Sequence, residues 1–100
     1  GAPRKGGSYN DNDLMLLRIE GARDWQSHAN TDGFFMAVTG KLDIELREGR
    51  GRLEPGELYV VPTGVEHRLV ARPSASILQI EPAGTPKTSE YVPAGTKARI

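Results

Sequence analysis

Hydrophobic and polar residues alternate along several short stretches of this chain, a pattern typical of half-buried β-strands. In the clearest stretch, 41–47, Leu42, Ile44 and Leu46 alternate with charged residues without interruption. Apolar runs at 34–38, 58–61 and 76–81 have the length of strands. The run 14–20 fits a strand or a short helix, and its length favours the strand. No longer stretch has the helical period, so the pattern predicts an all-β sandwich or barrel.

The length allows one small domain. The chain has 100 residues, of which 37% are hydrophobic, as is usual for a globular protein. Residues 1–13 are polar and glycine-rich, and we expect a flexible arm or a tag remnant there. Residues 14–88 are predicted to form the β domain. Prolines and glycines follow the last strand, and residues 89–100 are predicted to be an extended tail.

Composition excludes several kinds of function. Thirteen Lys and Arg balance thirteen Asp and Glu, so no basic excess indicates a nucleic-acid partner. The longest apolar run, 34–38, is far shorter than the roughly 20 residues of a membrane span. The absence of cysteine excludes disulfides and thiolate chemistry, and we expect a cytoplasmic protein. Any imidazole chemistry must use His28 or His67, the two histidines of the chain.

Two segments resemble the motifs of the cupins, a family of small β-barrel proteins. The first is WQSHANTDG at 25–33, which runs on to Gly40, and the second is EPGELYVVPTGVEHRLVA at 54–71. The second contains the spacing Gly56-x5-Pro62-x-Gly64-x2-His67, which is specific to the family. The resemblance implies an all-β, cupin-type jelly-roll β-barrel of one domain, and small cupins are often homodimers.

The resemblance also implies a metal site that has lost half of its ligands. Cupin enzymes bind Fe, Mn, Ni or Zn through three histidines and one glutamate. In this chain those positions are held by Gln26, His28, Gly33 and His67, so only His28 and His67 remain as metal ligands. Asp32 and Glu66 adjoin two of the positions, but strand alternation turns them to the other face. We therefore expect a divalent transition metal at low occupancy or none.

Three functions remain open from the sequence. The first is the binding of a small molecule in a pocket of Gln26, His28, Gly33, Phe35 and His67, in which the missing side chain of Gly33 either enlarges the cavity or lets a neighbour collapse inward. The second is a metal-dependent enzyme of the dioxygenase, decarboxylase or sugar isomerase type with a two-histidine site. The third is a scaffold without a ligand. Both faces of 34–38 are apolar, so the outer face needs cover from the N-terminal segment or from a second subunit, and the resemblance to small cupins favours a homodimer.

Overall fold

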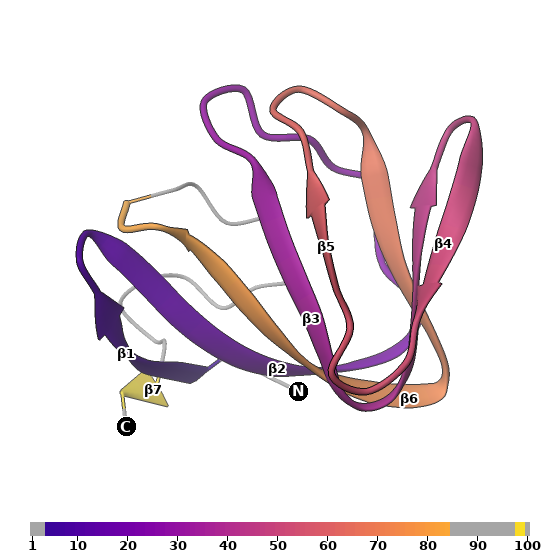
Figure 1. Cartoon of the computed structure of the whole chain (residues 1–100), viewed down its shortest axis with the longest axis horizontal. Coiled ribbons are helices and arrows are strands. Elements are labelled where there is room, and N and C mark those ends of the chain that lie inside the picture. Colours follow the sequence, from indigo (N-terminus) through magenta and orange to yellow (C-terminus); the bar gives the residue numbers. More distant parts are fainter. Residues whose placement is uncertain (1–3, 85–97, 100) are drawn as a thin grey trace.

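The computed structural model of the chain describes residues 4–84 and 98–99. Within these ranges every regular element is a strand, and none is a helix that could span a membrane. The strands form one sheet in the order β4-β3-β6-β2-β1-β7, with β5 paired to β3 as well (Figure 1). They are β1 (Arg4–Tyr9), β2 (Asn12–Ala22), β3 (Gly33–Leu46), β4 (Gly49–Leu53), β5 (Leu58–Val61), β6 (His67–Pro82) and β7 (Ala98–Arg99). The predicted all-β fold is confirmed.

Two long bent strands shape the molecule. The sequence predicts separate strands at 34–38 and 41–47, but the structure joins them in β3, which bends at Gly40 with a φ of 74°. The first half of β3 pairs with β5 and the second half with β4, while β6 runs antiparallel along both halves. The predicted strand 76–81 is likewise the second half of β6, which begins at His67. Because β3 and β6 bend together, the sheet curves around an interior (Figure 1).

The interior is apolar over most of its length. Strand alternation turns Leu42 and Ile44 of β3 inward, as the sequence predicts, and both are at most 1% exposed. The strand from His67 onwards contributes Leu69 and Ala71 to the same interior. The cluster consists of Leu17, Ile19, Phe35, Ala37, Leu42, Ile44, Leu53, Val61, Leu69, Ala71, Ala75 and Ile77. This core fixes which side chains of the two motif segments lie inside.

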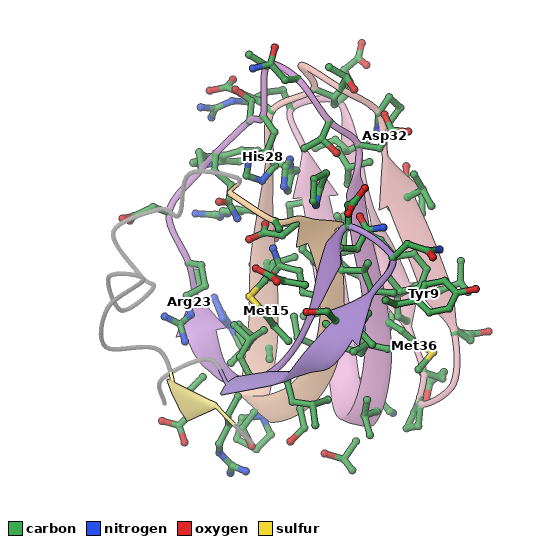
Figure 2. All side chains as sticks on the ribbon, turned by 90° about the vertical axis from the view of Figure 1, so that its left-hand side faces the viewer. Tyr9, Met15, Arg23, His28, Asp32 and Met36 are labelled. Atoms are coloured by element: carbon green, nitrogen blue, oxygen red, sulfur yellow. The ribbon has the colours of Figure 1, made fainter. Side chains whose placement is uncertain are left out.

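The outer face of the same sheet is also apolar. Two rows of side chains cross β2, β6, β3 and β5 in register, and together we call them the outer apolar face. Met36 of this face and the buried Met15 lie on opposite sides of the sheet (Figure 2). Leu16 and Leu58 remain 46% and 53% exposed. The rows are Leu14, Ile80, Phe34, Val60 and Leu16, Leu78, Met36, Leu58.

Two segments differ from the prediction. Residues 4–9, expected in a flexible arm, form β1, which pairs with β2, and β2 begins at Asn12. The segment 49–53, which lies between the predicted strands 41–47 and 58–61, forms β4. Both strands contain several glycines and polar residues, and backbone hydrogen bonds hold them in a way that hydrophobic alternation does not indicate. The predicted tail 89–100 lies outside the described residues except for β7.

Candidate functional site

Gln26 and His67 lie directly opposite each other. The backbone N–H of each residue donates to the carbonyl of the other at 2.9 Å, which forms an isolated antiparallel bridge between the 23–28 segment and the start of β6. Both side chains are buried, at 8% and 1% exposure. The N–H of Arg23 donates to the carbonyl of Leu69 at 2.9 Å and extends the pairing. The first motif is therefore attached to the second by main-chain hydrogen bonds.

The imidazole of His67 has a defined tautomer. Its Nδ1 lies 2.9 Å from the carbonyl oxygen of Val65, and a carbonyl only accepts, so Nδ1 carries the hydrogen. Burial lowers the pKa of His67, and the hydrogen bond to Val65 opposes this shift. The ring is therefore neutral near pH 7, and Nε2 presents a lone pair. That Nε2 atom is buried without a hydrogen-bond partner among the described residues, as is Oε1 of Gln26.

His28 and Phe35 complete the surroundings of His67. The ring centroids of His28 and His67 are 5.9 Å apart, and those of Phe35 and His67 are 5.6 Å apart. The carbonyl of His28 accepts from the N–H of Gly64 at 2.8 Å, which links its loop to the Gly64 turn of the second motif. His28 lies in the upper part of the molecule in Figure 2. The structure thus brings Gln26, His28, Phe35 and His67 together.

Gly33 is buried in β3, and the ring of Phe35 lies beside it. A Cβ atom on Gly33 would lie 3.0 Å from Cε2 of Phe35, which is closer than most real contacts, and 3.8 Å from Cβ of Val61. Space at this position is therefore occupied by an aromatic ring. Of the two alternatives for Gly33, the geometry favours inward collapse of a neighbour over an enlarged cavity.

The two carboxylates next to the motif positions, Asp32 and Glu66, form contacts away from the histidines. Asp32 is exposed, and its Oδ1 accepts from the backbone N–H and the hydroxyl of Thr63 at 2.8 and 2.9 Å. Glu66 is exposed and pairs with Nε of Arg47 at 2.9 Å. In the described part of the chain, no group of three or more His, Asp or Glu residues could hold a metal ion. Two imidazoles and an amide leave the charge of a divalent cation uncompensated in a buried site, so these residues fit a resident metal poorly.

Sequence reasoning missed a set of buried polar residues on β2 and β6. Asp13, Gln79 and Glu81 are 6%, 1% and 3% exposed, and Asp13 lies opposite Glu81 in the strand register. Nε2 of Gln79 donates to Glu81 at 3.4 Å. Two carboxylates are therefore buried in the interior, but among the described residues they form no group with the histidines that could hold a metal ion. The pattern of 76–81 does not reveal these residues, because Leu78 and Ile80 make the outer face of β6 apolar as well.

The comparisons identify the family. A model of the cupin domain matches residues 14–80, most of the described barrel. The chain belongs to the cupin family. This cupin is similar to the crystal structure of a cupin-2 domain containing protein from Shewanella frigidimarina NCIMB 400, with 40% sequence identity and a TM-score of 0.79 over 81% of this chain and 79% of that chain.

Two less similar solved structures share the fold. Protein NMB1881 from Neisseria meningitidis is 26% identical, with a TM-score of 0.73 over 81% of this chain and 82% of that one. Hydroquinone 1,2-dioxygenase from Sphingomonas sp. TTNP3 is 22% identical, with a TM-score of 0.67 over 81% of this chain and 66% of the dioxygenase. No curated protein sequence matches the chain. At 22% identity the enzyme shows the fold alone.

The lowered pKa of His67 predicts a pH-dependent stability. The unfolded chain binds a proton near the ordinary pKa of 6.5, while the folded chain binds it only at lower pH, so the free energy of unfolding falls as the pH drops below about 6.5. The loss cannot exceed about 1.4 kcal/mol per pH unit for one group. Urea unfolding of the wild type and His67→Gln between pH 7.5 and 5.5 checks this. A slope that persists unchanged in the variant would contradict it.

Proposed function

We propose that this cupin binds a small molecule at Gln26, His28 and His67, without a resident metal. The observation that carries the proposal is the pair of buried acceptors, Nε2 of His67 and Oε1 of Gln26, which have no hydrogen-bond partner among the described residues. An unsatisfied buried polar atom lowers the stability of the fold by about 1–3 kcal/mol, so two such atoms on facing residues call for an explanation. A bound ligand that donates hydrogen bonds to both atoms would explain them.

The chemistry of the two atoms selects the ligand class. Both atoms are acceptors, because Nδ1 of His67 already donates to Val65 and Oε1 of Gln26 is a carbonyl oxygen. The ligand must therefore present hydrogen-bond donors such as hydroxyl or amino groups. The ring of Phe35, 5.6 Å from that of His67, supplies an apolar wall. A small hydroxylated molecule with an apolar or aromatic body fits both requirements.

Replacing Gln26 by leucine separates binding from stability. Leucine keeps a similar volume but removes the buried carbonyl, so the unfolding free energy should stay level or rise by about 1 kcal/mol. Binding of hydroxylated ligands should be lost. Thermal shift with paired probes, such as phenol against anisole and catechol against its dimethyl ether, measures both effects.

The matched variant is Gln26→Glu, which keeps an acceptor at the same position. The wild type and Gln26→Glu should show saturable shifts with the hydroxylated probes and none with the methylated ones. Equal shifts with both members of each pair would contradict the assignment of the acceptors. A stability loss of several kcal/mol in Gln26→Leu would indicate that the amide has a structural role instead.

We also propose that a second copy of the chain covers the outer apolar face. Its eight side chains carry no charge, so the face can meet itself across a twofold axis without like-charge repulsion. Sheets pack well face to face through such apolar rows. With Leu58 and Val60 at 53% and 45% exposure, a contiguous apolar surface across four strands has the character of an interaction site.

The dimer is tested by one substitution on β2 and its control. Leu16→Lys places a charge in the outer apolar face and should convert dimer to monomer at micromolar concentration. Glu20→Lys adds a lysine four residues further along the same strand, outside the two rows, and should leave the dimer intact. Sedimentation velocity of the three proteins measures this. A monomeric wild type at tens of micromolar would contradict the proposal.

A further inference from the structure

A charged groove lies on the opposite face of the sheet from the histidines, over β3, β4 and β6. It has a volume of about 210 Å³. Its floor contains Asp43 and Val70, which are 8% and 5% exposed and pair with each other across β3 and β6. The lining residues are Lys41, Asp43, Glu45, Arg50, Arg52, Val70 and Arg72.

The groove carries an excess of positive charge in a chain with none overall. With Arg68, which pairs with Glu45, five cationic side chains surround two carboxylates, an excess of three charges. The chain as a whole has zero net charge. The strand register produces this segregation, because β3 places Asp43 and Glu45 between arginines of both neighbouring strands. A balanced composition therefore conceals a basic surface.

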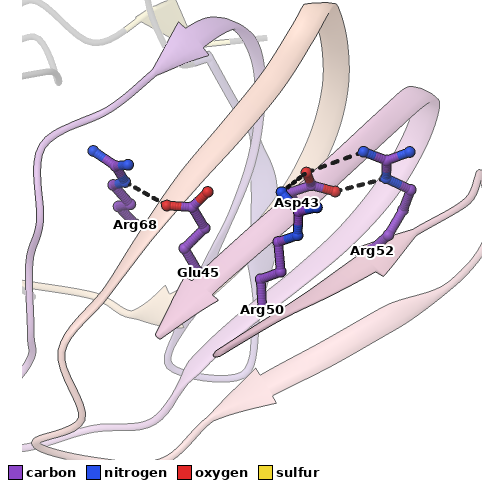
Figure 3. Close-up of polar contacts among 5 residues, drawn as sticks. All are labelled: Asp43, Glu45, Arg50, Arg52 and Arg68. Atoms are coloured by element: carbon purple, nitrogen blue, oxygen red, sulfur yellow. Dashed lines mark hydrogen bonds and ion pairs between the residues drawn. The ribbon is translucent and has the colours of Figure 1, made fainter. Parts of the chain in front are cut away.

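The two carboxylates hold their arginines in fixed positions (Figure 3). Nε and a terminal nitrogen of Arg52 donate to the two oxygens of Asp43 at 2.7 and 3.2 Å, and Arg50 approaches within 3.9 Å. Nε of Arg68 donates to Glu45 at 2.7 Å. The hydrogen bonds from Arg52, followed by the charges of Arg52, Arg50 and Arg72, lower the pKa of Asp43 despite its burial. Asp43 therefore stays ionised and keeps the guanidinium groups in place.

Positive groups remain available beside this fixed cluster. The side chains of Lys41 and Arg72 line the groove and take part in no ion pair or side-chain hydrogen bond within residues 4–84. Arg50 is 67% exposed, and its one recorded carboxylate contact is the long one to Asp43. These three side chains come from three different strands and face the same hollow. They can converge on one anion with several donors.

We propose that this groove binds a small molecule through a phosphate or diphosphate group. Several cationic donors around one hollow match the clustered oxygens of a phosphate, which arginine binds through paired hydrogen bonds. The volume is below the 300 Å³ or so of a site for a drug-sized molecule, so it suits the anionic group rather than a whole ligand. The groove is a separate site from the Gln26 and His67 pair, on the other face of the sheet.

Calorimetric titration at low ionic strength tests the proposal, with orthophosphate, pyrophosphate and phenyl phosphate as probes. The wild type should bind at least one of them saturably at one site, and added salt should weaken binding. Tighter binding of pyrophosphate assigns the groove to a diphosphate, and tighter binding of phenyl phosphate assigns it to a phosphate ester. Saturable binding of none of the three would overturn the proposal.

Charge-matched variants locate the binding. Arg72→Gln and Lys41→Gln should each weaken the affinity about tenfold, while Arg72→Lys, which keeps the charge, should retain most of it. Arg18→Gln removes an arginine of β2 that lies outside the groove and pairs with Glu20, and it should have little effect. Equal weakening by Arg18→Gln and Arg72→Gln would show a response to net charge alone and would overturn the groove assignment.

Discussion

Replacing Gly33 by glutamate in a Phe35→Leu background is expected to give this cupin a tightly bound divalent metal. Gly33 has no left-handed φ, so a side chain is compatible with its backbone. The obstacle is the Phe35 ring, which a Cβ would approach at 3.0 Å, and leucine removes the ring at a cost of about 1–2 kcal/mol. The new carboxylate would supply the negative charge that two imidazoles and Gln26 lack.

The neutral control is Gly33→Gln in the same background. Glutamine imposes the same steric change without the charge, so only the glutamate variant should gain affinity. We expect Ni²⁺ or Zn²⁺ to bind roughly a hundredfold more tightly to the glutamate variant than to the glutamine variant. Competition with a chelator dye measures the ratio. Equal affinities, or tight metal binding by the wild type, would show that the missing carboxylate is not what limits the site.

Gly40→Ala is expected to be the most destabilising small substitution in the barrel. Gly40 has a φ of 74°, where a side chain is strained, and a Cβ there would collide with the backbone carbonyl of Ser74. It would also lie 3.0 Å from Cα of Ala75, so the two long strands would have to separate at their common bend. We expect a loss of about 3 kcal/mol or more of unfolding free energy, measured by urea unfolding.

Gly21→Ala separates the strain from the collision. Gly21 also has a φ of 74°, but a Cβ there would meet no atom within 4 Å. Only the conformational cost remains, so the expected loss is about 1 kcal/mol. Gly49→Ala, at a glycine with neither feature, should be close to neutral. A loss at Gly40 no larger than that at Gly21 would contradict the close packing of β3 against β6 at the bend.

The sequence predicted the fold well where one face of a strand is buried and the other is exposed to solvent. The alternation of Leu42, Ile44 and Leu46 with charged residues placed the inner face of β3 correctly. The glycine and proline spacing of the second motif indicated the cupin family, which the match over 14–80 confirms. Both features are local, so each can be recognised from a short stretch of the sequence alone.

Features that depend on pairing between distant strands were not predictable. The burial of Asp13 and Glu81 follows from their place opposite each other in the β2–β6 register, and apolar residues on both faces of β6 hide which face is inner. The basic groove arises because β4 and β6 both present arginines beside β3, although the chain has no net charge. The ring of Phe35 occupies the space beside Gly33 because of its side-chain rotamer, which no sequence pattern encodes.

The central claim is that the buried acceptors of Gln26 and His67 serve a ligand with hydrogen-bond donors and not a metal ion. A crystal structure of the protein purified without chelators, with diffraction measured at the absorption edges of Fe, Ni and Zn, tests it most directly. We predict density for water or a hydroxylated small molecule within hydrogen-bond distance of Nε2 of His67 and Oε1 of Gln26, with no anomalous peak. A fully occupied anomalous peak about 2 Å from Nε2 of His67 would contradict the claim.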